Sequence, residues 1–475
     1  MEAQCGMGQA DRYDLVVVGG GPAGEKAAAQ AAYLGKRVAI VERLPRLGGT
    51  MVGGAVSSKT MREAALYLTG FKRRDIYDAG PDLTPQAAVA RLRSRTDQVE
   101  GQMSGSAAEN MRRHGVDVLH GDARLGPDRT VLVRGPSRDE RVLEAEVIVL
   151  ATGSRPLHPA EVPFDDPDVL DSDAAARLDQ PSKHLVVIGG GAVGCEFASI
   201  FMALGAEVVL VDSGPRLLPF MDGEISELLA ETFRADGMRV VHDAGHPAVV
   251  RGAEGLEVRL AGGEVLRPEK VVFAAGRHGN TDDLGLAEAG VETDERGRVV
   301  VDDHYRTTAP GIYAAGDVLG PPALGSVSME QARVAVCWAF DIPFKRTVDP
   351  LPPFGVYSIP EAAMLGMTEE AAIAQGIPHA VGRARFAGNT RAAIAGARDG
   401  LVKLVFARDD LRLLGVHILG DAATELIHQG QAVMHFKGTL DYFIHSAFNV
   451  PTLSEAYKYA AYDGLGAIAG RPRIT

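Results

Sequence analysis

Two stretches of the chain share one pattern of hydrophobic and polar positions. In each, a short apolar strand is followed by glycines, an Ala-rich or apolar helical run and a second apolar strand; the first stretch spans 13–42 and the second 184–212. Strands that are apolar without alternation are typical of a parallel sheet buried on both faces. The pattern therefore predicts two β-α-β units and a weak internal repeat.

Periodicity and punctuation predict the remaining elements in chain order. Helices are expected at 58–70 and, as a long polar helix with one apolar face, at 84–114. Strands are expected at 116–119, at 130–133, at 146–150 and, as a hairpin, within 401–419. Pro-rich stretches at 155–167 and 349–354 are interpreted as joints between domains.

Each β-α-β unit carries a G-x-G-x-x-G fingerprint between its first strand and its helix. The glycines are Gly19, Gly21 and Gly24 in the first unit, and Gly189, Gly191 and Gly194 in the second. In such a fingerprint the first glycine makes a tight turn, the second lets the backbone approach a pyrophosphate, and the third lets helix pack on strand. The helix N-terminus then offers free N–H groups to the phosphate charge.

An acidic residue ends the second strand of each unit. Glu42 and Asp212 stand where a carboxylate can accept hydrogen bonds from ribose hydroxyls. Two nucleotide sites in one chain suggest that electrons pass from one bound dinucleotide to another.

Composition narrows the function classes. A chain of 475 residues is too long for one core, and its net charge of −13 argues against nucleic acid or an anionic membrane as a main partner. No membrane span and no signal peptide are expected, and residues 1–11 are interpreted as a loose leader. The cysteines, Cys5, Cys195 and Cys337, are widely spaced, which favours a reducing, cytoplasmic setting without a metal site.

The order of these pieces resembles the pyridine nucleotide-disulfide oxidoreductases, flavoproteins related to dihydrolipoamide dehydrogenase and glutathione reductase. The resemblance extends from Asp11 to about Gly466. It implies an α/β fold with two Rossmann-like dinucleotide-binding domains plus a C-terminal α+β dimerisation domain. The implied domains are 12–155 and 279–348 for FAD, 156–278 for the nicotinamide cofactor and 349–475 for dimerisation.

The same resemblance implies the cofactors and the residues that contact them. The first fingerprint would bind FAD and the second NAD(H), with use of NADP(H) left open by Asp212. The segment 311–317 resembles the second FAD motif, whose Asp317 would bind the ribityl chain; the alternative is an Asp that caps the next helix. The further implied cofactor contacts are Ala123, Thr152, Gly153 and Gly276. The family's homodimer would place Val450 and Glu455 across the subunit interface.

Lys59 and Glu196 match a catalytic pair of this family. There the lysine lies near flavin N5 and pairs with a glutamate of the second fingerprint helix, so that its charge stabilises the reduced ring. The alternative is a solvated surface lysine.

The chain departs from the family where disulfide chemistry is expected. Met51 and Ala55 fall where the two redox cysteines belong, so the sequence excludes thiol–disulfide exchange at the flavin. Val450 replaces the histidine that acts as acid and base, although Glu455 remains. His445 lies five positions away and is interpreted as an ordinary polar or core histidine.

One branch of the family has lost these groups similarly: the soluble pyridine nucleotide transhydrogenases. The segments 58–70, 153–159, 171–173, 194–200, 276–281, 425–430 and 448–452 resemble that branch. The resemblance implies hydride transfer from NADH or NADPH through flavin to a second nicotinamide dinucleotide. Ser57 departs from the branch's Pro, and Asp212 disfavours a 2′-phosphate unless Arg216 binds it. An NAD(P)H-dependent quinone or dye reductase and a non-catalytic, flavin-bearing sensing subunit remain alternatives.

Overall fold

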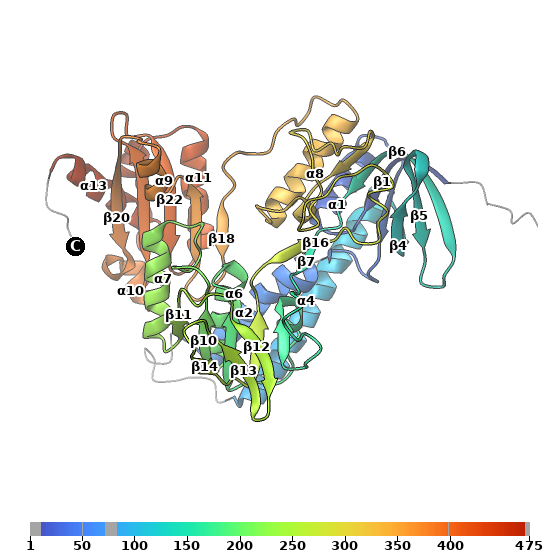
Figure 1. The fold of residues 1–475 in the computed structure, drawn as a ribbon. Helices are drawn as coiled ribbons and strands as arrows, with labels where there is room; N and C mark the ends of the chain where they lie inside the picture. Colours follow the sequence, from blue (N-terminus) through green and yellow to red (C-terminus); the bar gives the residue numbers. More distant parts are fainter. Residues whose placement is uncertain (1–10, 50, 72–82, 398, 471–475) are drawn as a thin grey trace, which may run out of the picture. The chain divides into compact units, whose positions relative to one another are not determined.

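The computed structural model describes residues 11–49, 51–71, 83–397 and 399–470 (Figure 1). The expected loose leader and Cys5 fall outside this range. By their internal packing the residues form two compact units, each made of three chain segments. The first unit comprises 1–57, 96–157 and 276–349, and the second comprises 58–95, 158–275 and 350–475. The four-segment domain division expected from the sequence stays a prediction.

The first unit is built on a seven-stranded sheet in the order β3-β2-β1-β6-β5-β4, with β17 paired to β6. Its strands are β1 (Asp11–Val18), β2 (Val38–Glu42), β3 (Asp117–His120), β4 (Asp122–Leu125), β5 (Thr130–Arg134), β6 (Glu140–Leu150) and β17 (Ile312–Ala314). Strands β3, β2, β1, β6 and β17 run parallel, whereas β4 and β5 add an antiparallel extension to β6. A small ladder pairs β7 (Ser154–Pro156) with β16 (Arg277–Gly279).

Both faces of the first sheet are buried, which explains its continuous apolar strands. Leu15 and Val17 face a cluster that includes residues of α1 (Pro22–Tyr33), the end of α4 (Pro85–Arg113) and α8 (Gly325–Ala339). Val16 and Val18 point to the other face, where β5 and the segment around Leu286 cover them. The expected helix at 84–114 and the strand at 130–133 are confirmed by α4 and β5.

The second unit contains a five-stranded parallel sheet in the order β11-β10-β9-β15-β8. Its strands are β8 (Val169–Asp171), β9 (His184–Ile188), β10 (Glu207–Val211), β11 (Arg239–Val241) and β15 (Lys270–Phe273). The helices beside it in the chain are α2 (Ser57–Thr69), α5 (Ser172–Ala175), α6 (Ala192–Ala203) and α7 (Gly223–Ala235). An antiparallel meander, β12 (Ala248–Gly252), β13 (Gly255–Arg259) and β14 (Val265–Leu266), accompanies the sheet.

The C-terminal part of the second unit is an antiparallel sheet with helices, in the order β18-β19-β22-β21-β20. The strands are β18 (Phe354–Val356), β19 (Ala362–Gly366), β20 (His379–Arg385), β21 (Leu401–Ala407) and β22 (Leu413–Leu419). The helices are α9 (Glu369–Ala374), α10 (Thr390–Ala395), α11 (Ala423–His435), α12 (Asp441–His445) and α13 (Glu455–Ile468). The hairpin expected within 401–419 is confirmed by β21 and β22.

A buried ion cluster links α7 to this antiparallel sheet. Lys403 of β21 is 2% exposed, and its Nζ lies 2.8 Å from Asp222 Oδ1 and 2.6 Å from Glu369 Oε2. Asp222 caps α7 through the Glu224 N–H and also accepts the Glu369 N–H that begins α9. One lysine therefore neutralises a carboxylate that holds two helix starts.

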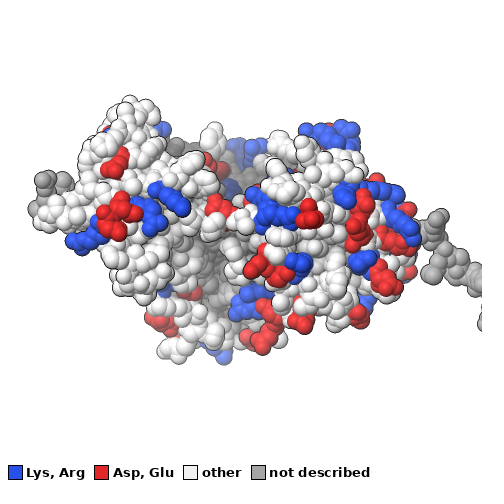
Figure 2. All heavy atoms as spheres, turned by 90° about the horizontal axis from the view of Figure 1, so that it is seen from above, with Lys and Arg blue, Asp and Glu red and all other residues white. Residues whose placement is uncertain are grey.

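Surface charge is mixed in sign. On the face drawn in Figure 2, basic and acidic side chains are interspersed, in keeping with exposed ion pairs such as Arg239–Glu264. Among the described residues, no helix combines the length and the hydropathy that a membrane span requires.

Candidate functional site

The first glycine fingerprint forms the turn between β1 and α1. Gly19 has a φ of +103°, and a Cβ there would lie 2.4 Å from the carbonyl oxygen of Ala151. A Cβ on Gly24 would lie 1.8 Å from the oxygen of Gly19. At Gly21, by contrast, an added Cβ meets nothing within 4 Å. The protein's own packing therefore explains two of the glycines, and open space beside the third fits a pyrophosphate.

The second fingerprint, between β9 and α6, repeats this arrangement in the second unit. Gly189 has a φ of +116°, and a Cβ there would lie 2.7 Å from the oxygen of Ala274. A Cβ on Gly194 would lie 1.8 Å from the Gly189 oxygen, whereas one on Gly191 meets nothing within 4 Å. Each unit thus has one open cradle at a helix N-terminus, where an anion is stabilised.

The two acidic residues are held beside these cradles by backbone groups. The N–H of Gly20 donates to Glu42 Oε2 at 2.7 Å, and that of Leu44 donates to Oε1 at 2.8 Å. The N–H of Gly190 donates to Asp212 Oδ1 at 3.1 Å. In both units the middle glycine of the fingerprint fixes a carboxylate at the strand end, where ribose hydroxyls can donate to it.

Asp317 lies at the start of a short 3₁₀ turn, η3 (Asp317–Leu319), but does not cap it. Gly316 occupies the N-cap position, and no side chain makes a capping bond there. The Asp317 carboxylate instead accepts from the hydroxyls of Ser328 at 3.2 Å and Ser154 at 3.3 Å. The capping alternative for Asp317 is therefore wrong, and both contacts are long enough to leave the carboxylate able to accept from a ligand.

Thr152 carries an unsatisfied buried hydroxyl. Its Oγ1 has no hydrogen-bond partner, although its own carbonyl oxygen accepts from the Asn280 side chain at 2.9 Å. Burying a hydroxyl without a partner costs about 1–3 kcal/mol, and such a group calls for an explanation. Thr152 follows Ala151, which packs on Gly19, so a ligand bound at the first cradle can supply the missing partner.

The other expected contacts of the first unit lie in ordinary backbone positions. Ala123 is in β4 and pairs with Val133. Gly153 has a φ of +70°, and its oxygen accepts from the Asn280 N–H. Gly276 has a φ of +148°, and its oxygen accepts from the Leu157 N–H at 3.0 Å. The contacts expected of these three residues stay predictions.

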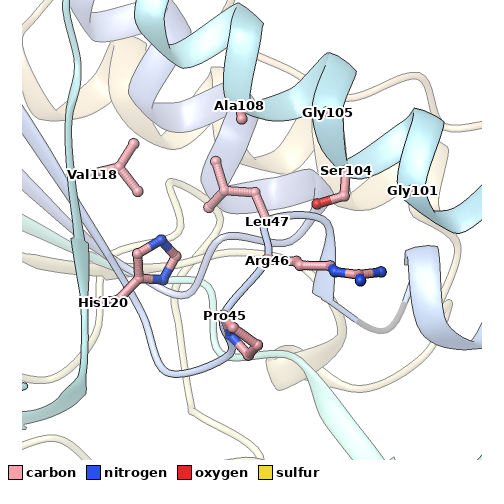
Figure 3. A pocket seen from close by; sticks show the side chains of 9 residues that line it. All are labelled: Pro45, Arg46, Leu47, Gly101, Ser104, Gly105, Ala108, Val118 and His120. Atoms are coloured by element: carbon pink, nitrogen blue, oxygen red, sulfur yellow. The ribbon is translucent and has the colours of Figure 1, made fainter. Parts of the chain in front are cut away.

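A groove of about 530 Å³ opens beside the end of β2 (Figure 3). The loop residues Pro45, Arg46 and Leu47 line one part of it, and Val118 and His120 of β3 line another. The facing residues of α4 are all small: Gly101, Ser104, Gly105 and Ala108. Since His120 is the register partner of Glu42, the groove begins next to that carboxylate. It offers room for a flat, partly apolar group attached to the ribose.

The structure brings Lys59 and Glu196 together. Lys59 Nζ on α2 lies 2.8 Å from Oε1 and 2.7 Å from Oε2 of Glu196 on α6. The glutamate side chain is 7% exposed and the lysine side chain 32%. Glu196 also accepts from the Ser58 hydroxyl at 3.3 Å and the Tyr357 N–H at 3.0 Å. The surface alternative for Lys59 does not hold, because this ammonium is paired and partly buried.

The segment that would carry a redox disulfide holds no thiol. Met51 to Val56 form one π-helical turn that runs directly into α2, and Ala55 lies within it. The cysteines among the described residues, Cys195 and Cys337, are fully buried. Burial, with the negative charges of Asp212 and Glu196, raises the pKa of the Cys195 thiol far above its usual value. Neither cysteine can present a thiolate to a substrate.

The C-terminal segment likewise lacks the expected proton-transfer group. Val450 is 66% exposed, and His445 is an exposed residue at the end of α12, so it is no core histidine. Glu455 begins α13. Arg216 is engaged elsewhere in the second unit, since its Nη2 donates to the Pro219 oxygen at 3.0 Å and its Nη1 lies 3.3 Å from Glu370 Oε1.

Sequence reasoning missed Tyr357, whose ring centre lies 5.0 Å from Lys59 Nζ. Tyr357 stands 161 residues from Glu196 and belongs to no fingerprint, so only the fold reveals the contact.

Comparisons with known proteins agree with this architecture. Residues 13–337 match the family described as pyridine nucleotide-disulphide oxidoreductase, and residues 352–461 match its dimerisation domain. A soluble pyridine nucleotide transhydrogenase from Mycobacterium bovis is 43% identical over 455 residues, covering 95% of this chain and 97% of the relative. One from Hahella chejuensis is 38% identical, covering 96% and 99%.

Solved structures show the same fold. The HOCl-induced flavoprotein disulfide reductase RclA from Escherichia coli, in its Cu(II) complex, has a TM-score of 0.86 at 26% identity, covering 95% of this chain and 99% of that one. LpdA from Mycobacterium tuberculosis gives the same TM-score, identity and coverage.

Proposed function

The chain belongs to the pyridine nucleotide-disulphide oxidoreductase family and is a flavoprotein oxidoreductase, and we propose that it transfers a hydride between nicotinamide dinucleotides without thiol–disulfide exchange. One observation carries the proposal. Two complete dinucleotide cradles, open at Gly21 and Gly191, occur in a chain whose redox segment contains Met51 and Ala55 in place of cysteines.

The first cradle has the groups needed to hold FAD. Gly21 opens toward the pyrophosphate, Glu42 accepts from the adenosine ribose, and Asp317 accepts from the ribityl chain. Thr152 Oγ1, buried and unpartnered, would gain its missing partner from the bound cofactor. The groove beside Glu42 would receive the adenine ring. When bound, FAD supplies a ring that takes up a hydride from one nicotinamide and releases it to the next acceptor.

The second cradle would hold the nicotinamide cofactor. Gly191 gives the pyrophosphate access to the N-terminus of α6, and Asp212 takes the adenosine ribose hydroxyls. Lys59 would act as the fixed cation beside the flavin, since its ammonium is already held by both oxygens of Glu196. A cation fixed before the reaction stabilises developing negative charge without reorganisation.

The missing thiol and the missing histidine support a non-disulfide acceptor. Thiol–disulfide exchange requires a thiolate and a group that moves its proton. Met51 and Ala55 provide no thiol, and Val450 provides no proton-transferring group. Reduction of disulfide substrates is therefore not expected.

A second candidate, an NADH-dependent reductase of quinones or dyes, is favoured by one specific observation. Arg216 is committed to Pro219 and Glu370, so no arginine side chain is shown to neutralise a 2′-phosphate beside Asp212. If NADP(H) binds poorly, another acceptor is needed.

The assembly and location follow from the same resemblance as proposals. The match to the dimerisation domain and the exposed aromatic residues Tyr442, Tyr459 and Tyr462 support a homodimer. Buried, unpaired cysteines are compatible with the cytoplasm.

Rapid-mixing absorbance measurements on the FAD-loaded protein test the proposal. The flavin is first reduced with NADH or NADPH and then mixed with thio-NADP⁺, thio-NAD⁺, quinones or dyes. We expect reoxidation by the thionicotinamide analogues. Reoxidation by quinones or dyes alone would make the second candidate correct. A flavin that neither NADH nor NADPH reduces would contradict both and favour a non-catalytic, flavin-bearing subunit.

A further inference from the structure

Tyr357 and Glu196 together surround the ammonium group of Lys59. Both Glu196 oxygens lie within 2.8 Å of Lys59 Nζ, and the centre of the Tyr357 ring lies 5.0 Å away. Tyr357 also donates its backbone N–H to Glu196 Oε1 at 3.0 Å. A cation within about 6 Å of an aromatic face is attracted to it. The same residue therefore contacts both members of the ion pair.

The backbone of the segment after Tyr357 is fixed at several points. The oxygen of Ser358 accepts from Arg62 Nε at 3.0 Å, and the N–H of Ile359 donates to the Ser199 hydroxyl at 3.1 Å. Ser199 lies on α6, the helix that carries Glu196, and Arg62 lies on α2, the helix that carries Lys59. The ring is thereby held relative to both helices of the ion pair.

A buried ion pair completes this anchoring. Arg62 Nη2 lies 3.1 Å from Glu361 Oε1, and the two side chains are 7% and 10% exposed. The other oxygen of Glu361 accepts from the backbone N–H of Thr424 at 3.0 Å and from its hydroxyl at 2.7 Å. Buried, fully hydrogen-bonded networks rigidify the segment that they hold.

The phenol of Tyr357 stays neutral across the working range of pH. Burial raises its pKa above the usual value, and the neighbouring carboxylates of Glu361, Glu425 and Glu196 act in the same direction. The ring consequently presents an uncharged face to the ammonium.

We propose that Tyr357 is a positioning residue for Lys59, whose ring restricts the ammonium to the place where it acts on the flavin. The inference rests on the proposed role of Lys59. A free lysine side chain loses about 2 kcal/mol of rotamer entropy when fixed, so a second contact besides Glu196 has a clear use. Tyr357 itself touches the lysine and the glutamate, and no reacting atom is assigned to it.

The flavin reduction potential, measured by equilibrium titration against a reference dye, tests the inference. Tyr357→Leu removes the aromatic face, and we expect the equilibrium for flavin reduction to weaken about threefold to fivefold, which is ~14–21 mV for a two-electron couple. Tyr357→Phe keeps the face and should retain the wild-type potential. Tyr357→Met is the second variant without an aromatic face, should the leucine variant fold poorly.

A double-mutant cycle separates positioning from general structural damage. In a Lys59→Met background, replacing Tyr357 by Leu or Met should produce no further change in potential. Tyr33→Leu, at a tyrosine that is 79% exposed in the other unit, is the control. Thermal unfolding and FAD content report on folding of every variant.

Three outcomes are decisive. An equal shift with and without Lys59, or a shift in Tyr357→Phe as large as in Tyr357→Leu, would overturn the role of Tyr357. Unchanged potentials in both variants that lack the aromatic face would do the same. If Lys59→Met alone leaves the potential unchanged, the proposed role of Lys59 fails instead.

Discussion

Selectivity for NADH over NADPH depends on Asp212, and replacing this residue is the sharpest test of the nicotinamide site. The Gly190 N–H holds one carboxylate oxygen of Asp212 at 3.1 Å, at the end of β10. We expect NADH to reduce the flavin with a higher kcat/KM than NADPH by at least about tenfold, equivalent to about 1.4 kcal/mol. Asp212→Ser and Asp212→Asn should relax this preference and leave the FAD content unchanged.

The magnitude follows from the groups that would meet a 2′-phosphate. A hydrogen bond between a ribose hydroxyl and a carboxylate is worth about 1.5–3 kcal/mol, so its loss alone gives a factor of about 10–150. Repulsion between two unit charges about 4 Å apart adds about 1 kcal/mol in water and up to about 4 kcal/mol near a protein surface. Tenfold is therefore the lower end of the expected preference.

Compensating cations are not evident beside Asp212. Arg216 contacts the Pro219 oxygen and Glu370. His242 follows β11, and burial and the charge of Arg234 lower its pKa, which keeps the ring neutral at pH 7. Arg216→Ala is accordingly the matched control, since it should leave kcat/KM for both dinucleotides unchanged.

The assay is rapid-mixing reduction of the flavin by each dinucleotide over a range of concentrations, at fixed ionic strength because charge repulsion is screened by salt. Wild-type protein that prefers NADPH would refute the reasoning. A large loss of NADPH use in Arg216→Ala would show that Arg216 moves to the phosphate when NADPH binds.

Asp317→Ala should lose most of the flavin, measured by absorbance after gel filtration; full retention would remove Asp317 from the site. Lys403→Met should lower the free energy of unfolding by about 3–5 kcal/mol in denaturant titrations, because it leaves Asp222 buried and unpaired, whereas Lys437→Met at an exposed lysine should not. Burial raises the pKa of Asp222, but His417 and Lys403 bring it below its usual value. This contribution is therefore complete above about pH 3.9, is lost as pH falls further, and should be missing in Asp222→Asn. Two-electron reduction should produce no thiolate-to-flavin charge-transfer band, and such a band would contradict the assignment of the redox segment.

The two cradles could be predicted from the sequence because their requirements are local. Gly19 and Gly24 face backbone oxygens so closely that no side chain fits, and these clashes arise within one strand, turn and helix or at the adjacent strand. Glu42 and Asp212 follow at the next strand end, and the sheet register places them. Short-range geometry of this kind leaves a readable pattern.

The surroundings of Lys59 could not be predicted in the same way. Tyr357 and Glu361 reach the lysine helix across roughly 300 positions, and neither belongs to a periodic or glycine-marked motif. Lys403 reads from sequence as an ordinary strand lysine, yet it is almost fully buried among carboxylates. Contacts between distant segments depend on the packing of whole elements, which hydrophobic periodicity does not encode.

The chemistry of the acceptor also bears on the groups that this chain lacks. A nicotinamide takes up a hydride and nothing else, whereas a disulfide or a quinone takes up protons as well when it is reduced by two electrons. A chain with Val450 in place of the histidine has no side chain there to deliver such protons. The cradles and the Lys59–Glu196 pair, by contrast, are the parts that hydride transfer between dinucleotides uses. The groups present and the groups absent thus favour a nicotinamide acceptor over a quinone, unless solvent supplies the protons directly.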